Sequence, residues 1–514
     1  MIARLDAALG RVSTFRIVIG ALVSLVVVSI VYGLIGASAF RATEQLASLA
    51  VILVVAHLVN ALAARVARVS PNLASTTVTA LVLFFLLPPH LDLPRLGLTA
   101  VAAAVAAASK YLIAVRGRHV LNPAAFGGFV ASVVGLGPAI WWVATPLMLP
   151  FVTIAALAVL IRVRHVLIGF VMVGLAAMIV TTRMVGLGLD PWSGVTLALG
   201  SFPLVFLAGF MLSEPLTLPP RRWQQVIVAA IVAVVIAVPF STGTLDLGGY
   251  EVGPISSTPE FALIVGNIVA FFFGQRRGIT LELVAKRQLT PTSWDFEFRP
   301  LAPVHFQAGQ FVQITLPHRH SDAKGTRRVF SIASASPESI RLGVKTTPPV
   351  SSFKHLLLDL EPGARVGATG VGGDFVLPRD PGTPLLLVAG GIGITPFVGH
   401  LEQLAADARD AGIDPDVVVV YAVSSPHELA YLPELSRSGA RILVASPSEP
   451  EEPAAAWTWL GPERLTAATI MTAVPDATRR QTYLSGPPTL VESLRHALRR
   501  AGVRHIRTDV FLGY

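Results

Sequence analysis

The first half of the chain consists of long apolar runs separated by short polar loops. Because a helix needs ~20 mostly apolar residues to cross a bilayer, the pattern predicts about ten transmembrane spans. Gly127, Gly128 and Gly135 lie within or next to the fifth run, which would allow a broken or re-entrant helix there. The ten runs cover residues 17–36, 47–64, 73–89, 97–115, 124–137, 143–161, 166–182, 195–212, 224–240 and 258–274.

The pattern changes at Gln275-Arg-Arg-Gly278. Polar and apolar residues alternate in segments 281–285, 295–298 and 311–315, which is typical of antiparallel strands. From about Pro384 the strands are unbroken apolar runs separated by helical stretches, which indicates a parallel sheet covered by helices. We therefore predict a helical membrane domain over residues 1–275, an antiparallel β-barrel over 279–380 and a doubly wound α/β domain over 381–514.

The composition supports a membrane protein. Hydrophobic residues make up 53% of the chain, charged residues 14%, and the mean hydropathy is +0.66. The net charge of +9 comes in the first half from arginines in short loops, so we attribute it to membrane topology and predict no nucleic-acid partner. The chain has no cysteine, which excludes disulfides, thiol catalysis and cysteine-ligated iron–sulfur clusters.

The loop arginines also predict an orientation. They are concentrated in alternate loops, and the positive-inside rule places those loops in the cytoplasm. The pairs are Arg65 and Arg68, Arg116 and Arg118, Arg162 and Arg164, Arg221 and Arg222, and Arg276 and Arg277. We expect a multi-pass protein of a bacterial-type inner or plasma membrane, without a cleavable signal peptide. Both termini and the whole second half would then face the cytoplasm, where NAD(P)H is found.

Three polar stretches interrupt the apolar half: Asn122-Pro-Ala-Ala-Phe126, Asp190-Pro-Trp-Ser-Gly-Val-Thr196 and Ser213-Glu-Pro215. Taken singly, each has a structural interpretation. The first is a helix start, the second an N-cap provided by Ser193, and the third a helix terminator. His57, inside the second run, is interpreted as a packed, hydrogen-bonded histidine.

Together with residues 79–89, these stretches resemble a membrane flavoprotein family that includes the B subunit of the sodium-pumping NADH:quinone reductase and the D subunit of the Rnf complex. The resemblance covers residues 15–275. It implies FMN attached through its phosphate to Thr196 by a flavin transferase, with Ser193 and Gly194 in the same motif. Val195 departs from the alanine that is usual there. The predicted topology places this loop outside the cytoplasm.

A faint internal repeat links residues 87–95 with residues 214–221, since both follow an apolar run and are rich in proline. Five predicted spans separate the two copies, so the copies would be inverted in the membrane. Inverted repeats commonly enclose a central site. A chance match between proline-rich loop ends is the alternative.

The second half carries an ordered series of motifs. They are Phe306-x-Ala-Gly-Gln-Phe311, Arg328-x-Phe-Ser331, Ser351-Ser352, Gly390-Gly-Ile-Gly-Ile-Thr-Pro396, Ser485-Gly-Pro-Pro488 and Phe511-x-Gly-Tyr514. The glycine-rich turn follows a predicted strand and opens a helix, a position where backbone N–H groups and the helix dipole bind pyrophosphate. The series resembles the ferredoxin–NADP reductase-like family over residues 279–514.

This resemblance implies FAD in the barrel and a nicotinamide nucleotide on the α/β domain. Arg328 would pair with the FAD pyrophosphate, Phe330 would stack on the isoalloxazine ring and Ser331 would bond near flavin N5. Ser351 and Ser352 would hold phosphate at a helix start. The nicotinamide nucleotide would contact Gly390, Gly391, Gly393, Thr395, Pro396, Ser485, Gly486 and Pro487, and Tyr514 would cover the flavin. Ser331, Ser485 and Tyr514 are the candidate catalytic residues.

Several positions depart from the family pattern. Phe330 replaces the common tyrosine, Ser485 the common cysteine, and Pro348-Pro349 the usual glycine before the paired serines. No arginine follows Tyr421 to bind a 2′-phosphate, and Glu428 would repel one, so we expect a preference for NADH.

Joined together, the two halves predict a transmembrane flavin-based oxidoreductase. Electrons would pass from cytoplasmic NAD(P)H through FAD to FMN at Thr196, and on to a quinone or an extracytoplasmic redox protein. The bilayer core is ~30 Å thick, too far for one efficient electron hop, so a second flavin or a quinone is expected near Asn122 and Glu214. No metal site is predicted.

Two alternatives remain open. A haem-dependent transmembrane reductase would need histidine pairs on facing helices, whereas His57 is the one histidine clearly inside an apolar run. A transporter with a redox-sensing domain is the other alternative, suggested by the faint repeat.

Overall fold

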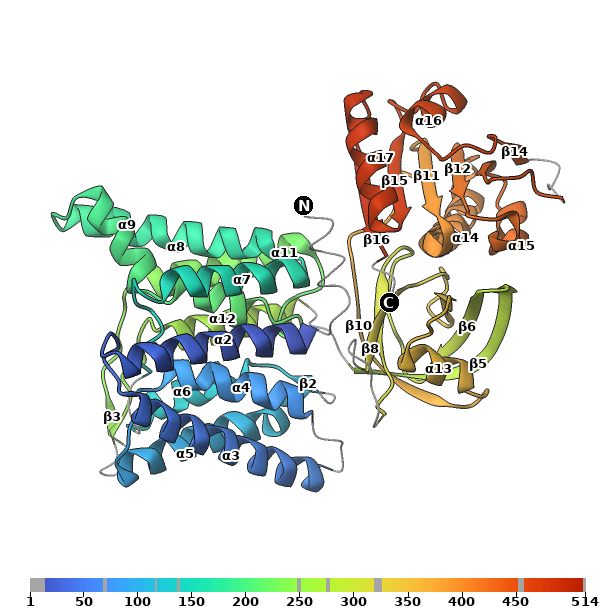
Figure 1. The fold of residues 1–514 in the computed structure, drawn as a ribbon. Coiled ribbons are helices and arrows are strands. Elements are labelled where there is room, and N and C mark those ends of the chain that lie inside the picture. The colour runs from blue at the N-terminus through green and yellow to red at the C-terminus, as the bar shows by residue number, and fades with distance from the viewer. Residues whose placement is uncertain are drawn as a thin grey trace. The chain divides into compact units, whose positions relative to one another are not determined.

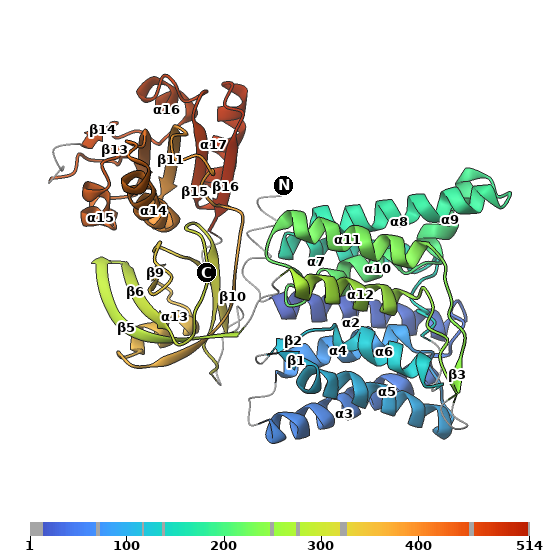
Figure 2. The same ribbon diagram turned by 180° about the vertical axis from the view of Figure 1, so that it is seen from behind.

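The structure is a computed structural model that describes residues 14–67, 72–115, 118–135, 139–246, 251–273, 278–318, 326–451 and 457–511. The chain divides into two compact units at about residue 278. The first unit is helical, and the second contains two six-stranded sheets (Figures 1 and 2).

The first unit is a bundle of helices lying alongside one another (Figure 1). A helix or broken helix lies at each of the ten positions predicted from the apolar runs. In order they are α2 (Thr14–Leu34), α3 (Ala42–Val66), α4 (Leu73–Leu86), α5 (Leu93–Leu112), α6 (Pro123–Val133), α7 (Leu149–Val163), α8 (Val166–Gly186), α9 (Pro191–Gly200) with α10 (Leu204–Leu207) and the π-helix η1 (Ala208–Leu212), α11 (Arg222–Ala237) and α12 (Pro259–Phe272). Two short hairpins, β1 (Ala114–Val115) with β2 (Arg118–His119) and β3 (Leu245–Asp246) with β4 (Glu251–Val252), complete the unit.

The expected count of about ten spans is wrong. Among the described residues, α2, α3 and α8 are long and apolar enough to cross a membrane, and the bent pair from α9 to η1 brings the number to four at most. Proline and glycine explain part of the difference, because they shorten or break several of the helices. Pro88 follows α4, Pro203 separates α9 from α10, and Pro123 and Gly135 limit α6 to 11 residues. A helix of 14 residues is about 21 Å long, shorter than a bilayer core of ~30 Å.

The two halves of the bundle have the same pattern of neighbours. In the first half α3 packs on α4 and α5, and α5 packs on α6. In the second half α8 packs on α9 and α11, and α11 packs on α12. The halves meet where α2 packs on α7 and where the short helices α6 and α12 pack on each other.

The barrel has six antiparallel strands in the order β8-β7-β10-β5-β6-β9. An isolated bridge between Ile332 and Leu342 joins the strand ends next to β8 and β9, which closes the sheet. The strands are β5 (Gly278–Thr290), β6 (Ser293–Pro300), β7 (Phe311–Thr315), β8 (Arg327–Ser331), β9 (Ile340–Lys345) and β10 (Arg365–Gly372), and helix α13 (Ser352–Asp359) covers one end. The alternation seen in the sequence is explained by side chains such as Phe296 and Phe298, which point inward and are fully buried.

The α/β part has six parallel strands in the order β14-β13-β12-β11-β15-β16. Alternate residues of β11 enter two different cores, so Leu385 and Leu387 pack with α14 while Leu386 and Val388 pack with α17. The predicted doubly wound sheet is thus confirmed. Its strands are β11 (Leu385–Gly390), β12 (Val417–Ala422), β13 (Arg441–Ala445), β14 (Trp457–Trp459), β15 (Gln481–Gly486) and β16 (Ile506–Val510), and its helices are the 3-10 turns η2 (Gly391–Ile394) and η3 (Pro426–Glu428) with α14 (Thr395–Ala411), α15 (Leu432–Arg437), α16 (Ala467–Ala473) and α17 (Pro488–Arg500).

Candidate cofactor sites

Two glycine turns meet at the carboxyl edge of the parallel sheet. The turn after β11 contains Gly390, Gly391 and Gly393, and Gly486 ends the neighbouring strand β15. A Cβ on Gly393 would lie 2.6 Å from the Ser485 carbonyl oxygen, and one on Gly486 would lie 3.0 Å from the carbonyl oxygen of Gly390. Gly391 and Gly486 also have positive φ values of +55° and +147°. These contacts require glycine, and they bring the two turns close together at the edge where doubly wound sheets bind nucleotides.

The residues around these turns start two helices. Thr395 begins α14, is fully buried, and its hydroxyl donates to the Ile392 carbonyl oxygen at 2.7 Å. Pro396 occupies the first turn of α14, and Pro487 is the N-cap residue of α17. Both helices therefore begin at the same edge, where the positive end of the helix dipole favours an anion.

Ser485 lies at the end of β15 and is 1% exposed. Its hydroxyl has no hydrogen-bond partner within the residues that the structure describes. A buried hydroxyl without a partner costs free energy, so its position beside the glycine turns fits a polar ligand group bound there.

In the barrel, Arg328 is 2% exposed although it carries a permanent charge. Its guanidinium lies 5.1 Å from the centre of the Phe353 ring and donates to the Arg327 carbonyl oxygen at 2.8 Å. Phe330, two residues along β8, has its ring 6.0 Å from that of Phe353. Such a buried, planar guanidinium beside aromatic rings suits a phosphate of a flavin nucleotide.

The paired serines begin α13, as expected from the sequence. Ser351 is the N-cap residue, and its side chain accepts from the Lys354 N–H at 3.3 Å. The Ser352 hydroxyl lies 2.9 Å from His318 Nε2. Both side chains are half-buried at the helix N-terminus, where a phosphate would be stabilised.

Ser331 has a partner that the sequence reasoning missed. Its hydroxyl donates to a carboxylate oxygen of Asp509 on β16 at 2.9 Å. The two residues are 178 positions apart, and no local pattern marks Asp509. This bond joins the barrel to the α/β sheet beside the glycine turns. Tyr514, the other candidate at this position, lies outside the described residues.

Glu428, which the sequence predicts to repel a 2′-phosphate, is bonded to two residues of the barrel part. Its carboxylate accepts from Lys345 Nζ at 2.7 Å and from the Thr292 hydroxyl at 2.8 Å, both on the barrel. The preference for NADH over NADPH stays a prediction, because the negative charge of Glu428 is compensated by Lys345.

In the helical unit, Asn122 and Glu214 lie together, 92 positions apart in the sequence. Asn122 Nδ2 donates to Glu214 Oε2 at 2.9 Å, and His119 Nε2 lies 3.0 Å from Glu214 Oε1. The Asn122 backbone N–H donates to the side-chain oxygen of Asn267 on α12 at 2.7 Å. Asn122 also caps α6, as expected, through the N–H of Ala125. His119 and Asn267 were not among the predicted site residues.

The Asp190–Thr196 motif forms the start of α9. Asp190, rather than Ser193, is the N-cap residue, and it accepts from the Ser193 N–H at 3.0 Å. The alternative in which Ser193 caps the helix is therefore wrong. Thr196 is exposed, its hydroxyl donating to the Ser193 carbonyl oxygen at 3.0 Å, and Gly194 is buried against Thr181.

The histidines of the helical unit do not favour the haem alternative. His57 Nε2 lies 3.1 Å from the Thr77 hydroxyl, which confirms the hydrogen-bonded interpretation. His119 is bonded to Glu214, and His165 Nδ1 to the Ser213 carbonyl oxygen at 3.1 Å. Over the described ranges, no group of three or more His, Cys, Asp or Glu side chains could hold a metal ion.

Comparison with known proteins finds similarity over the second half of the chain. The sequence model of the family described as "Oxidoreductase NAD-binding domain" matches residues 387–496. The reductase subunit of an aromatic O-demethylase from Amycolatopsis sp. is 31% identical over 222 residues, which are 41% of this chain and 62% of that protein. Ferredoxin–NADP reductase B of Sorangium cellulosum is 35% identical over 158 residues, 30% of this chain and 61% of that protein. The chain thus spans less than two thirds of the length of either relative.

Among solved structures, the Amycolatopsis cytochrome P450 reductase GcoB is similar with a TM-score of 0.39 and 26% identity, covering 46% of this chain and 70% of that one. The resemblance of residues 15–275 to the membrane flavoprotein family stays a prediction. Residues 387–496 thus match the oxidoreductase NAD-binding domain model, and the second half of the chain is similar in sequence to reductases, including a ferredoxin–NADP reductase.

Proposed function

We propose that the protein is an NAD(P)H-dependent flavoprotein oxidoreductase whose second half transfers electrons from the nicotinamide nucleotide to FAD. The observation that carries this proposal is the backbone contact between the glycine turns after β11 and β15, beside the buried Ser485 hydroxyl. Relatives named as reductase subunits and as a ferredoxin–NADP reductase support the same reaction class.

FAD would be held by the barrel, with Arg328 on its pyrophosphate, Ser351 and Ser352 at the start of α13, and Phe330 against the ring. Bound FAD would accept a hydride and release electrons singly. The glycine turns, Thr395, Pro396 and Pro487 would bind the nicotinamide nucleotide. The Ser331–Asp509 bond would hold the serine hydroxyl in one orientation and give it a proton acceptor at 2.9 Å.

The helical unit would anchor the reductase in a membrane. The helices α2, α3 and α8 support this, as each is long and apolar enough to span. The matching neighbour patterns of the two halves support an inverted repeat, whose central pair would be α6 and α12. The arginine-rich loops support a cytoplasmic location for the reductase and for both termini.

Within this unit, FMN would be attached to Thr196 by a flavin transferase. The Thr196 side chain is exposed, which would give such an enzyme access to it. A second flavin or a quinone would lie near Asn122 and Glu214 and relay electrons. The final acceptor would be a quinone or an extracytoplasmic redox protein. Relatives named as reductase subunits of oxygenase or demethylase systems support transfer to a separate partner.

The reductase activity is tested by mixing purified full-length protein anaerobically with NADH or NADPH and following bleaching of flavin absorbance. We expect rapid reduction in wild type, and NADH to be the better donor. Gly393→Ala places a Cβ 2.6 Å from a backbone oxygen, so reduction should slow at least tenfold. Gly367→Ala, on open space in β10, should behave as wild type. A wild type that neither nucleotide reduces rules the proposal out.

The covalent flavin is tested by in-gel fluorescence after denaturation, in a host that contains the transferase. Wild type and Thr182→Ala, which removes another exposed threonine, should fluoresce, whereas Thr196→Ala should not. A dark wild-type band would contradict the attachment without affecting the reductase proposal.

A further inference from the structure

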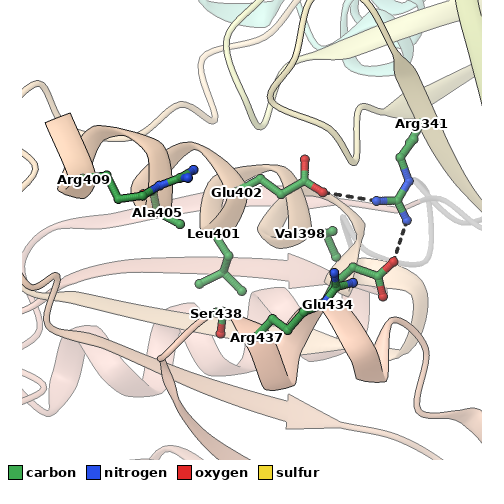
Figure 3. A pocket seen from close by; sticks show the side chains of 9 residues that line it. All are labelled: Arg341, Val398, Leu401, Glu402, Ala405, Arg409, Glu434, Arg437 and Ser438. Carbon is green, nitrogen blue, oxygen red and sulfur yellow. Dashed lines mark hydrogen bonds and ion pairs between the residues drawn. The ribbon is translucent and has the colours of Figure 1, made fainter.

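A group of charged side chains joins the barrel to the α/β part. Arg341 on β9 and Asp295 on β6 come from the barrel, and Glu402 on α14 and Glu434 on α15 come from the α/β part. We call these four residues the Arg341 cluster. Figure 3 shows Arg341 reaching between Glu402 and Glu434, with an ion pair to each.

The Arg341 guanidinium uses every nitrogen. Nε and Nη2 donate to one oxygen of Asp295 at 3.0 and 2.7 Å, Nη2 also to Glu434 at 2.8 Å, and Nη1 to Glu402 at 3.1 Å. The side chains of Asp295, Glu434 and Arg341 are 6, 10 and 16% exposed. One planar cation therefore holds carboxylates from three different elements in a fixed geometry, which a lysine could not reproduce.

Two further residues extend the cluster across the same boundary. Arg287 on β5 donates to Glu434 at 2.6 Å, and the Tyr431 hydroxyl donates to the second Asp295 oxygen at 3.0 Å. Tyr431 is 1% exposed. Both oxygens of Asp295 are thus bonded, one of them to the α/β part.

The cluster lies close to the proposed nucleotide site through β9 and α14. A Cβ on Gly343, two residues after Arg341, would lie 2.5 Å from the Thr395 hydroxyl and 2.8 Å from that of Tyr431. Thr395 begins α14 directly after the glycine turn, and Glu402 lies two turns further along the same helix. The Arg341 cluster therefore holds the helix whose N-terminus would face the nicotinamide nucleotide.

A pocket of about 410 Å³ lies beside the Arg341 cluster, between residues of α14 and α15. The pocket is lined by Val398, Leu401, Ala405 and Arg409 of α14, by Arg437 and Ser438 at the end of α15, and by three members of the Arg341 cluster. The pocket lies beside the place where Leu435 of α15 shares a core with Val398 and Leu401 of α14. At the rim of the pocket, Arg341 bonds one carboxylate from each of the two helices (Figure 3).

We propose that the Arg341 cluster positions the nucleotide-binding sheet against the FAD-binding barrel for hydride transfer. Donor and acceptor atoms react efficiently only when they are ~3–3.5 Å apart and aligned, so a small rotation between the two parts slows the step strongly. Arg341 is a positioning residue, because it is not among the residues proposed to hold either cofactor. The inference rests on the proposed function.

The test is a stopped-flow measurement of flavin reduction in the full-length protein at saturating NADH. Arg341→Gln is expected to reduce the limiting rate at least tenfold and to weaken the long-wavelength charge-transfer absorbance of the reduced flavin–NAD⁺ complex. FAD content should be unchanged. Arg341→Lys, which keeps the charge but loses the fork, should recover only part of the rate. Arg299→Gln removes an exposed ion pair within the barrel and should match wild type.

A second variant keeps the proposal testable if the Arg341→Gln protein does not fold. Glu402→Gln changes the most exposed carboxylate of the cluster, 38% exposed, and should lower the rate severalfold with FAD retained. Normal rates and normal charge-transfer absorbance in both Arg341→Gln and Glu402→Gln would overturn the proposal, as would a rate loss explained wholly by lost FAD. A wild-type flavin that is not reduced at all would overturn the proposed function, whereas a wild type that is reduced at the same rate as both variants would overturn the positioning role alone.

Discussion

The predicted sites of the helical unit and of the reductase unit differ in how their buried polar groups are satisfied. In the helical unit, Glu214 is bonded on both oxygens by His119 and Asn122. At the sheet edge of the reductase unit, the Ser485 hydroxyl is without a partner across the described ranges, and two glycine turns pack closely beside it. A polar network whose hydrogen bonds are all made within the protein contributes to stability. A buried hydroxyl without a partner at a sheet edge is instead suited to bind a ligand.

Substitutions in the two sites are therefore expected to change different measured quantities. Removing a member of the Glu214 network leaves buried partners unsatisfied, so the free energy of unfolding should fall first. Removing a group at the sheet edge or in the barrel takes away a contact to a bound nucleotide, so cofactor affinity or electron-transfer rate should fall first.

The largest effect is expected for Glu214→Ala. The carboxylate is 22% and the His119 side chain 10% exposed, so breaking this pair should cost roughly 3 kcal/mol, the low end for buried pairs. Thermal unfolding in detergent measures the loss. NADH-driven reduction of FAD should be unchanged. If the variant is as stable as wild type but has lost its membrane flavin, Glu214 would instead be a cofactor ligand. The Glu214 network and the sheet edge would then no longer differ in role.

The next effect is on FAD affinity. Arg328→Gln removes the buried guanidinium of the barrel, and a lost hydrogen bond to a charged phosphate is worth about 1.5–3 kcal/mol, roughly 10–100-fold in affinity. Fluorescence titration of deflavinated protein with FAD measures it. Arg365→Gln, on an exposed arginine of the same barrel, is the control. Unchanged FAD affinity in Arg328→Gln would remove this residue from the flavin site.

Sequence patterns located these helices and strands well because periodicity is a local property. The helix positions of the bundle and the strands at 311–315 and 385–389 follow from residues a few positions apart. The span count failed for the same reason, since whether Pro203 bends a helix or ends it depends on the neighbours packed around it.

The partners within the sites could not be predicted in the same way. Ser331 meets Asp509 and His119 meets Glu214 across 178 and 95 positions. A lone aspartate near the chain end has no spacing pattern, and only the closing of the barrel and the order of the parallel strands bring it to Ser331.

A pH measurement tests a buried histidine of the reductase unit, His400, which is fully buried. Burial lowers the pKa of His400 to about 4, and its Nε2–H donates to the Phe375 carbonyl oxygen at 2.9 Å. The unfolded chain takes up this proton near pH 6.5 and the folded chain does not, so stability is fully present above pH 6.5 and is lost as the pH falls toward 4. At pH 5 the loss should be on the order of 2 kcal/mol.

The measurement is the unfolding free energy of the reductase unit in the full-length protein between pH 7 and pH 5. His400→Gln should flatten the profile, and His505→Gln, on an exposed histidine, should not. A profile unchanged by His400→Gln would show that other groups carry the acid sensitivity.

The smallest effect tests the sheet edge itself. Ser485→Ala removes the unpartnered hydroxyl, and if a nicotinamide group bonds to it, hydride transfer should slow by less than tenfold, about 1.4 kcal/mol or less. Thr482→Val is a matched control, because Thr482 lies on the same strand, is fully buried and also has an unpartnered hydroxyl. If the sheet edge binds nucleotide, only Ser485→Ala should change the rate of flavin reduction, while Thr482→Val should leave it unchanged. Equal effects of the two variants would mean that the unpartnered hydroxyl at the carboxyl end of β15 marks no ligand, and the contrast with Glu214 would then rest on the glycine contacts alone.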